Sequence, residues 1–324
     1  MAAQFLTQLF DGFSSRTHGE RYTRRIAPYK QPVLIYNPAA GRIRQDPERF
    51  IERSITALKG IGIVPQVFPT GGAGDATKLA TRAVNAGADL VIALGGDGTI
   101  NETANGLIPG RVPLAILPAG TANVLCKETG LGTNVERAVQ RLASCSERRI
   151  AVGRVRGEGC ARYFLAMAGG GLDAAVVTRV SPWWKAKTGK GAYWLAGTSQ
   201  SFKPITQCDI SANGRQGQFG FVLASRVRNY GGDLEIASTA SLVRDDLEVV
   251  LFSGDNPIRY WMYMAAVLFG QVQTLPGVST LAARRLTLGN DAPVQIDGEY
   301  IGKGPVTIES VPDALTLLIP PEYR

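Results

Sequence analysis

Two short segments of the chain combine glycine with carboxylates in a pattern that suits phosphate chemistry. The first is GGDGTINE, residues 95–102, which follows the apolar run Leu90–Leu94 and carries Asp97 among three glycines. Glycine lets the backbone approach a ligand closely, and amides at the start of a helix converge on phosphate oxygens. A carboxylate at this point fits a metal ion, a hydroxyl or nearby amides as its partner. Taken alone, the loop also fits a plain strand–turn–helix connection.

The second segment is QIDGEY, residues 295–300, in which Asp297 and Glu299 flank a glycine. Alternation along a strand would project both carboxylates to the same side. Asp-Gly is also the commonest hairpin turn pair, which would leave the Glu as an incidental residue of a solvated turn. On its own, the segment favours the turn.

The first segment belongs to one of four successive strand–loop–helix units. Apolar runs end at Tyr36, Phe68, Leu94 and Leu117, and a glycine-rich or polar loop follows each of them. Because the carboxyl ends of parallel strands share one edge, we expect a doubly wound sheet with its ligand at that edge. Asp46 followed by Pro47 predicts the start of the first helix.

The pattern changes near residue 150. From there to about Glu299 the chain runs in short segments of alternating apolar and polar residues, such as RIAVGRVR and FGFVLASRV. Closely spaced short strands predict an antiparallel sandwich or barrel. Two helices are expected within it, at about residues 191–202 and 258–272.

Composition bounds the function further. The chain has 324 residues, 45% of them hydrophobic, which favours two domains, and a net charge of +8 with a pI near 9.4. This charge favours an anionic partner, whether nucleic acid, a phosphorylated ligand or an acidic membrane. Four cysteines without metal-type spacing indicate reduced thiols in a cytosolic protein. With His18 as the only histidine, Ser-His-Asp chemistry and histidine-based metal sites are nearly excluded.

Two segments admit contact with other surfaces. No run reaches the roughly 18 apolar residues that span a bilayer, but residues 5–13 gather apolar side chains on one helical face. That face suits packing within the protein or against a second subunit better than a membrane surface. The segment 183–194 interleaves tryptophan with lysine, which fits core packing, a membrane interface or base stacking.

The glycine loop resembles that of a known family. GGDGTINE matches the GGDGTxNE nucleotide loop of the diacylglycerol kinase catalytic family, which includes sphingosine kinases and bacterial lipid kinases; a related GGDGT occurs in NAD kinases and phosphofructokinases. The order of NPAAG (37–41), Thr70, PAGTAN (118–123) and IDGE (296–299) also matches this family. The resemblance covers residues 32 to about 320, and this ordered set favours a lipid kinase over an NAD kinase.

The resemblance implies a fold and a site. The expected fold is an α/β nucleotide-binding domain, Rossmann-like and NAD kinase-like, at residues 31–150, and a C-terminal antiparallel β-sandwich at 151–305 for the lipid. Residues 1–30 form an extension, and about 306–324 return to the first domain. ATP with Mg²⁺ is the expected cofactor. The residues expected at the nucleotide are Asn37, Pro38, Gly41, Thr70, Gly95, Gly96, Asp97, Gly98, Thr99, Asn101, Glu102, Gly120, Thr121 and Asn123.

The resemblance also implies catalytic roles. Glu299 is the expected base that removes the proton from the lipid hydroxyl, with Asp297 in support, and Asp97 orders the phosphates and metal. The expected acceptor is a diacylglycerol-like lipid. A sphingoid-base or ceramide kinase, an NAD kinase and a non-catalytic lipid-binding protein stay open as alternatives. We expect a cytoplasmic protein in peripheral contact with a membrane, with no nucleic-acid partner and with a homodimer as one candidate assembly.

One departure from the family stands out. Family members commonly carry an Asp-Gly-x-Leu-Asp stretch, part of a metal-linked acidic network, before the strand that LEVVLF resembles. Here the string is LVRDDLEVV, with Arg244 in place of the first Asp. Either Asp245 and Asp246 substitute as metal ligands, or this ion site is lost.

Overall fold

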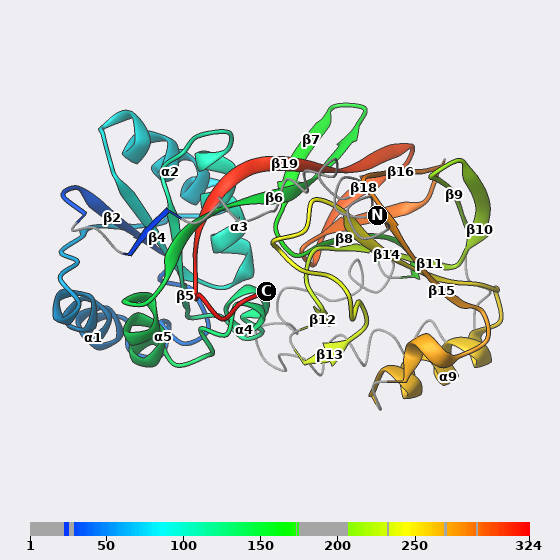
Figure 1. Ribbon diagram of the computed structural model, residues 1–324, viewed down its shortest axis with the longest axis horizontal. Helices are drawn as coiled ribbons and strands as arrows, with labels where there is room; N and C mark the ends of the chain where they lie inside the picture. The colour runs from blue at the N-terminus through cyan, green and yellow to red at the C-terminus, as the bar shows by residue number, and fades with distance from the viewer. Residues whose placement is uncertain are drawn as a thin grey trace, which may run out of the picture.

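The computed structural model describes residues 23–25, 29–172, 174, 207–231, 233–268, 271–289 and 291–324. Figure 1 shows two lobes, an α/β lobe and a β-rich lobe, joined by long strands. The apolar face at 5–13, the tryptophan–lysine segment at 183–194 and the expected helix at 191–202 lie outside the described residues.

The first lobe is a parallel sheet covered by helices. Its strands are β2 (Pro32–Tyr36), β3 (Gln66–Pro69), β4 (Leu90–Gly95) and β5 (Leu114–Pro118), in the order β5-β4-β2-β3. All three pairings are parallel. Every residue of β4 and β5 is buried, as expected where helices cover both faces.

Five helices cover this sheet. They are α1 (Pro47–Gly60), α2 (Asp75–Asn85), α3 (Asp97–Leu107), α4 (Val124–Glu128) and α5 (Val135–Leu142). In Figure 1, α1 and α5 lie on one side of the strands and α2 and α3 on the other. The predicted start of α1 is confirmed, because the Asp46 side chain accepts a hydrogen bond from the Arg49 amide with Pro47 in the first turn.

The second lobe is an antiparallel sandwich. One sheet has the order β15-β14-β11-β8-β17-β18. Its strands are β8 (Met167–Gly171), β11 (Phe221–Ser225), β14 (Leu247–Phe252), β15 (Val278–Ala283), β17 (Pro293–Ile296) and β18 (Glu299–Lys303). The facing layer contains β6 (Ser146–Gly157), β7 (Cys160–Phe164), β9 (Cys208–Ala212), β10 (Arg215–Phe219), β16 (Arg285–Leu288) and β19 (Val306–Ile319). A separate core cluster, which includes Phe164, Val222 and Leu286, lies between them.

Smaller elements complete the described chain. The strand β1 (Thr23–Arg25) pairs with β6, and β12 (Asn229–Tyr230) pairs with β13 (Leu234–Glu235). The helix α9 (Pro257–Leu268) and the short helix η2 (Val272–Thr274) occupy the region expected to be helical at 258–272. Within the described residues, no helix combines the length and the apolar composition needed to cross a bilayer.

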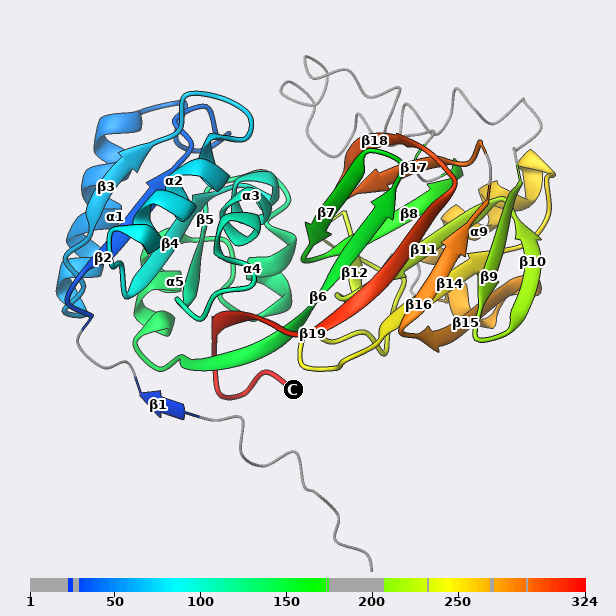
Figure 2. The same cartoon turned by 90° about the horizontal axis from the view of Figure 1, so that it is seen from above.

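The strand β19 connects the two lobes. Its first part pairs with β16, it pairs with β6 along most of its length, and Leu317 near its end pairs in parallel with Leu114 of β5. Figure 2 shows β6 and β19 running together from one lobe into the other. The expected fold, an α/β domain followed by an antiparallel β-sandwich, is confirmed.

Candidate active site

Four strand ends of the first lobe meet at one edge of the sheet. The Asn37 amide after β2 donates to the Leu94 carbonyl at 3.3 Å, and the Ala119 amide after β5 donates to the Gly95 carbonyl at 2.9 Å. The Thr70 amide after β3 donates to the Tyr36 carbonyl at 2.9 Å. The segments expected to line the nucleotide pocket therefore lie side by side.

The glycines at this edge permit close packing of two loops. A Cβ atom on Gly120 would lie 2.5 Å from the Gly96 Cα, and a Cβ on Gly95 would lie 2.6 Å from the Thr99 Cβ. Gly96 has φ of −85°, so left-handed backbone is not the reason for a glycine there. A Cβ on Gly98 would meet nothing within 4 Å. Gly95 and Gly120 are thus required by the protein's own packing, whereas a Cβ on Gly96 would lie 3.4 Å from the Gly120 Cα and Gly98 faces open space.

Asp97 is the carboxylate at the centre of this edge. It begins α3, and its Oδ1 accepts a hydrogen bond from the Leu125 amide of α4 at 3.3 Å. Burial raises the pKa of Asp97, and hydrogen bonds from the amides of Leu125 and Val124 partly offset that rise. The carboxylate therefore links the loop after β4 with the helix after β5.

Several other expected nucleotide residues organise the same loops. The Asn37 side-chain amide donates to the Thr99 hydroxyl at 3.4 Å. Asn123 has φ of 50°, and its side chain exchanges two hydrogen bonds of 2.9 Å with the backbone of Gly120. A Cβ on Gly41 would lie 3.4 Å from the Thr121 hydroxyl. These residues form one connected cluster.

Two expected nucleotide residues point elsewhere. The Glu102 carboxylate accepts a hydrogen bond from the Ala76 amide at 3.3 Å and so anchors the start of α2 on α3. Asn101 is buried, and both its backbone and its side-chain oxygens accept hydrogen bonds from the Asn105 side chain. Their carboxylate and amide groups are hydrogen-bonded to neighbouring helical residues.

The Asp-Gly-Glu segment forms a tight hairpin between β17 and β18. Asp297 and Gly298 have φ of 47° and 80°, and Ile296 pairs with Glu299. The expectation that strand alternation sends both carboxylates to one side is wrong, because positions 297 and 298 are the turn itself. The alternative prediction, that Asp-Gly forms a hairpin turn, is confirmed for the backbone.

The Asp297 side chain is nevertheless far from an ordinary solvated turn residue. Its two oxygens accept hydrogen bonds from the amides of Leu165, Ala166 and Met167 at 3.2, 3.1 and 2.8 Å. Burial, opposed by these amides and reinforced by the charge of Asp97, raises the pKa of Asp297 to about 6. The Asp297 carboxylate is therefore buried and fixed by three successive amides of its own lobe.

Glu299 occupies a more open position at the start of β18. Its side chain is 64% exposed, and one carboxylate oxygen lies 2.8 Å from the Arg162 guanidinium of β7. An exposed ion pair of this kind stabilises the fold little. The Glu299 carboxylate is therefore accessible to a ligand.

Sequence reasoning missed the residues that connect the two lobes behind these carboxylates. The Asn105 side chain of α3 exchanges two hydrogen bonds of 3.1 Å with the backbone of Tyr163 in β7. Tyr163 adjoins Arg162, the partner of Glu299. No local sequence signal marks Asn105, because its partner lies 58 residues away.

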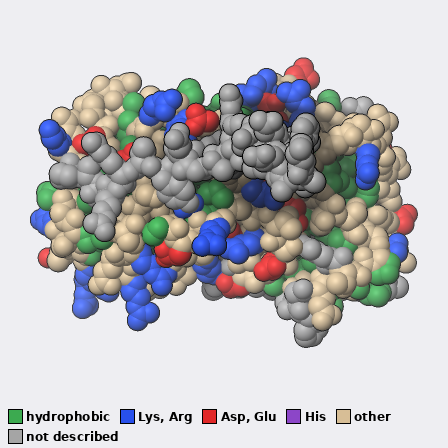
Figure 3. Space-filling view, viewed as in Figure 1, with side chains coloured by type: hydrophobic (Ala, Val, Ile, Leu, Met, Phe, Trp, Pro, Cys, Tyr) green, Lys and Arg blue, Asp and Glu red, His purple; other side chains and the backbone are tan. Residues whose placement is uncertain are grey.

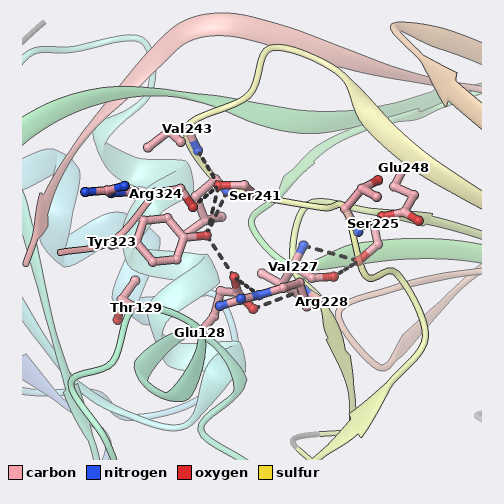
Figure 4. Close-up of polar contacts among 12 residues, drawn as sticks. Glu128, Thr129, Ser225, Val227, Arg228, Ser241, Val243, Glu248, Tyr323 and Arg324 are labelled. Atoms are coloured by element: carbon pink, nitrogen blue, oxygen red, sulfur yellow. Dashed lines mark hydrogen bonds and ion pairs between the residues drawn. The ribbon is translucent and has the colours of Figure 1, made fainter. Parts of the chain in front are cut away.

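A second connection centres on Glu128, at the end of α4 (Figure 4). Its buried carboxylate accepts hydrogen bonds from the amide and Nε of Arg228, at 3.0 and 3.2 Å, and from the Tyr323 hydroxyl at 2.8 Å. The Tyr323 hydroxyl in turn accepts from the Leu242 amide at 3.0 Å. The C-terminal tail thus ties the helix after the Gly120 loop to the second lobe.

The segment considered for an accessory metal has different partners. Both Asp246 carboxylate oxygens lie 2.7 Å from the Arg244 guanidinium, which lowers the pKa of Asp246. Across the described ranges, no group of three His, Cys, Asp or Glu side chains is placed to hold a metal ion. The assignment of Asp245 and Asp246 as metal ligands stays a prediction.

Comparisons with known proteins agree with this architecture. The model of the diacylglycerol kinase catalytic domain matches residues 31–155, and the model of the YegS C-terminal NAD kinase beta sandwich-like domain matches residues 166–319. Together they cover most of the chain in the order of its two lobes.

Curated relatives and solved structures give the same result. The diacylglycerol kinase of Bacillus subtilis is 29% identical over 85% of this chain and 92% of its own. That of Staphylococcus carnosus is 24% identical over 91% and 97%. A crystal structure of a diacylglycerol kinase from Bacillus anthracis superposes with a TM-score of 0.74 at 23% identity, covering 91% of this chain and 99% of that one, and supports the fold. The chain therefore belongs to the diacylglycerol kinase catalytic-domain family and is an enzyme of the lipid kinase class.

Proposed function

We propose that this chain transfers the γ-phosphoryl group of ATP to the hydroxyl of a diacylglycerol-like lipid. The observation that carries the proposal is a contact between the two lobes. Asn105 of α3, the helix that Asp97 begins, is hydrogen-bonded to the backbone of Tyr163, two residues before the first amide that holds Asp297. Phosphoryl transfer needs a nucleotide site and an acceptor site that face each other. The names of the curated relatives support diacylglycerol as the acceptor.

The glycine loops would hold the nucleotide. Gly98 leaves open space at the start of α3, where amides and the helix dipole favour phosphate oxygens. Mg²⁺ in such enzymes is bound by one or two carboxylates together with substrate phosphates. Asp97 at the loop suits this arrangement, and it would hold the ion that neutralises the phosphate charge.

The hairpin would act on the acceptor. The Glu299 side chain is 64% exposed beside its contact with Arg162, so it takes the proton from the lipid hydroxyl as that hydroxyl oxygen attacks. Asp297 serves as a positioning residue, because its hydrogen bonds to three successive amides fix the turn that carries Glu299.

The acceptor would come from a membrane surface. The net charge of +8 favours contact with anionic lipid headgroups. Figure 3 shows Lys and Arg side chains distributed over both lobes on the face in view. Such a distribution supports peripheral, charge-assisted contact on the cytoplasmic side. A homodimer stays a prediction.

The experiment that tests this function offers the purified chain labelled ATP with three acceptors in parallel, namely diacylglycerol in mixed micelles, sphingosine and NAD. We expect label in phosphatidic acid. Label in sphingosine phosphate alone would move the chain to the sphingoid-base kinases, and label in NADP alone would end the lipid proposal. Lipid binding without transfer to any acceptor would favour a non-catalytic protein.

A further inference from the structure

The side chain of Arg226 is buried at the end of β11, in the interior of the second lobe. Its exposed fraction is 0%, and it is the largest fully buried side chain among the described residues. Its backbone amide donates to the Ala166 carbonyl at 2.8 Å, beside the amides that hold Asp297. Arg226 is thus fixed close to the proposed acceptor site without belonging to it.

The guanidinium of Arg226 is surrounded by backbone carbonyls. Its Nη1 donates to the Asp246 carbonyl, and its Nη2 lies 2.8 Å from the Leu242 carbonyl, 2.7 Å from the Arg244 carbonyl and 3.1 Å from the Ala151 carbonyl. Three of the four acceptors are the carbonyls of every second residue in the loop 242–246. This loop is therefore wrapped around a positive charge that the protein itself supplies.

A buried cation needs such compensation. An ionised group removed from water is stable only if it is hydrogen-bonded or paired. A guanidinium stays protonated at neutral pH even inside a protein, so Arg226 places a positive charge in the interior of the lobe. The four carbonyls replace the hydration of its two terminal nitrogens, whereas its Nε is buried without a hydrogen-bond partner.

Arg244 and Asp246 contribute to the exterior of the loop. The Arg244 side chain is 46% exposed and holds Asp246 by two contacts of 2.7 Å. The side chain that departs from the family pattern is therefore turned outward, and it occupies a carboxylate that a metal ion would need. The carbonyl oxygens that face the inside of the loop, which could otherwise bind a metal ion, already accept hydrogen bonds from the Arg226 guanidinium.

We infer that the Arg226 guanidinium is the internal cation of the 242–246 loop, and that this chain folds the loop without a metal ion. In the family this stretch belongs to a metal-linked acidic network, but here the residues do not fit a metal. A cation bound by the same carbonyls would have to displace Arg226. The inference is independent of the proposed lipid kinase reaction, because it concerns the folded state without nucleotide.

The first test uses the unaltered protein in the absence of nucleotide. Thermal unfolding is recorded in the presence of a chelator, of Mg²⁺ and of Ca²⁺, and the metal content is measured after dialysis. We expect less than one equivalent of bound metal and a melting temperature that the chelator leaves unchanged. A stoichiometric ion whose removal lowers the melting temperature would overturn the inference.

The second test removes the guanidinium. Arg226→Met should lower the melting temperature by about 10 °C, because four buried carbonyls lose their donor. Arg226→Lys should fall between, since an ammonium keeps the charge but lacks the planar fork. Arg215→Met, at an exposed position of β10, is the control. If Arg226→Met melts like the control, the inference fails; if it does not fold, the chelator experiment on the unaltered protein decides.

Discussion

The edge of the first sheet that carries the glycine loops is the proposed nucleotide edge. This edge and the Asp-Gly-Glu hairpin of the second lobe each carry a carboxylate motif, yet they are built differently. At the nucleotide edge, parallel strands bring the loop segments together through backbone hydrogen bonds between neighbours such as Gly95 and Ala119. In the hairpin, the backbone is an ordinary tight turn, and its function depends on where tertiary contacts direct the side chains of Asp297 and Glu299.

The difference shows which part of a motif local rules determine. A parallel sheet places every strand end at one edge, so residue type and order suffice to locate the site. A turn determines φ and ψ but not burial. Asp297 is held in place only because residues 165–167, where the chain enters β8, present three amides to it.

The largest effect should distinguish Asp97 from Glu102 within the glycine loop. Asp97→Asn removes the charge at the junction of α3 and α4 and should lower kcat by about a hundredfold or more. Glu102→Gln, whose oxygen accepts from the Ala76 amide, should change kcat by less than about threefold. Steady-state lipid phosphorylation measures both. Equal losses would place Glu102 at the nucleotide after all.

The second test concerns the contact between the two loops of the nucleotide edge. Gly120→Ala would place a Cβ 2.5 Å from the Gly96 Cα, a contact with backbone that no rotamer relieves. We expect a loss of about 3 kcal/mol in the free energy of unfolding. Gly98→Ala, which meets nothing within 4 Å, is the matched control and should unfold like the unaltered chain. Denaturant titration compares them.

The third test addresses the ionisation of Asp297. Asp297 has a pKa near 3.8 in the unfolded chain and a pKa of about 6 in the folded chain. Between these values the folded state binds more protons, so the free energy of unfolding falls as pH rises. This contribution amounts to roughly 3 kcal/mol at most. The unaltered chain should lose stability relative to Asp297→Asn between about pH 4 and pH 7; parallel curves would refute the raised pKa.

The smallest effect concerns the connection between the lobes. Tyr323→Phe deletes the hydroxyl that bonds Glu128 and Leu242, and it should cost about 1–3 kcal/mol of stability because both partners are buried. Tyr300→Phe, at a side chain that is 41% exposed, should cost little. Urea unfolding of both variants measures the difference. If the C-terminal tail does not stabilise the protein, both variants will have the same midpoint of urea unfolding.

Much of the fold could be predicted from the sequence because its signals are local. The fully apolar runs of β4 and β5 and the Asp46–Pro47 helix start each follow from short-range rules. The antiparallel sandwich follows from the closely spaced alternating strands.

The remaining parts depend on contacts across long stretches of chain. The Asn105 side chain meets the backbone of Tyr163, and Glu128 meets Tyr323 at a separation of 195 residues. Arg226 offers no sign in the sequence that it is buried, because three of its four carbonyl partners come from the folded loop 242–246 and the fourth from Ala151 of β6. The sequence predicts the motifs, whereas these long-range contacts set their orientation.

We propose that the hairpin carboxylate Glu299 removes the proton from the lipid hydroxyl. The most direct measurement is single-turnover transfer of labelled phosphate from ATP to diacylglycerol by Glu299→Gln, with ATP affinity measured on the same preparation. We predict a rate at least about a hundredfold lower, with ATP affinity within about threefold of the unaltered chain. A rate close to that of the unaltered chain would contradict the assignment.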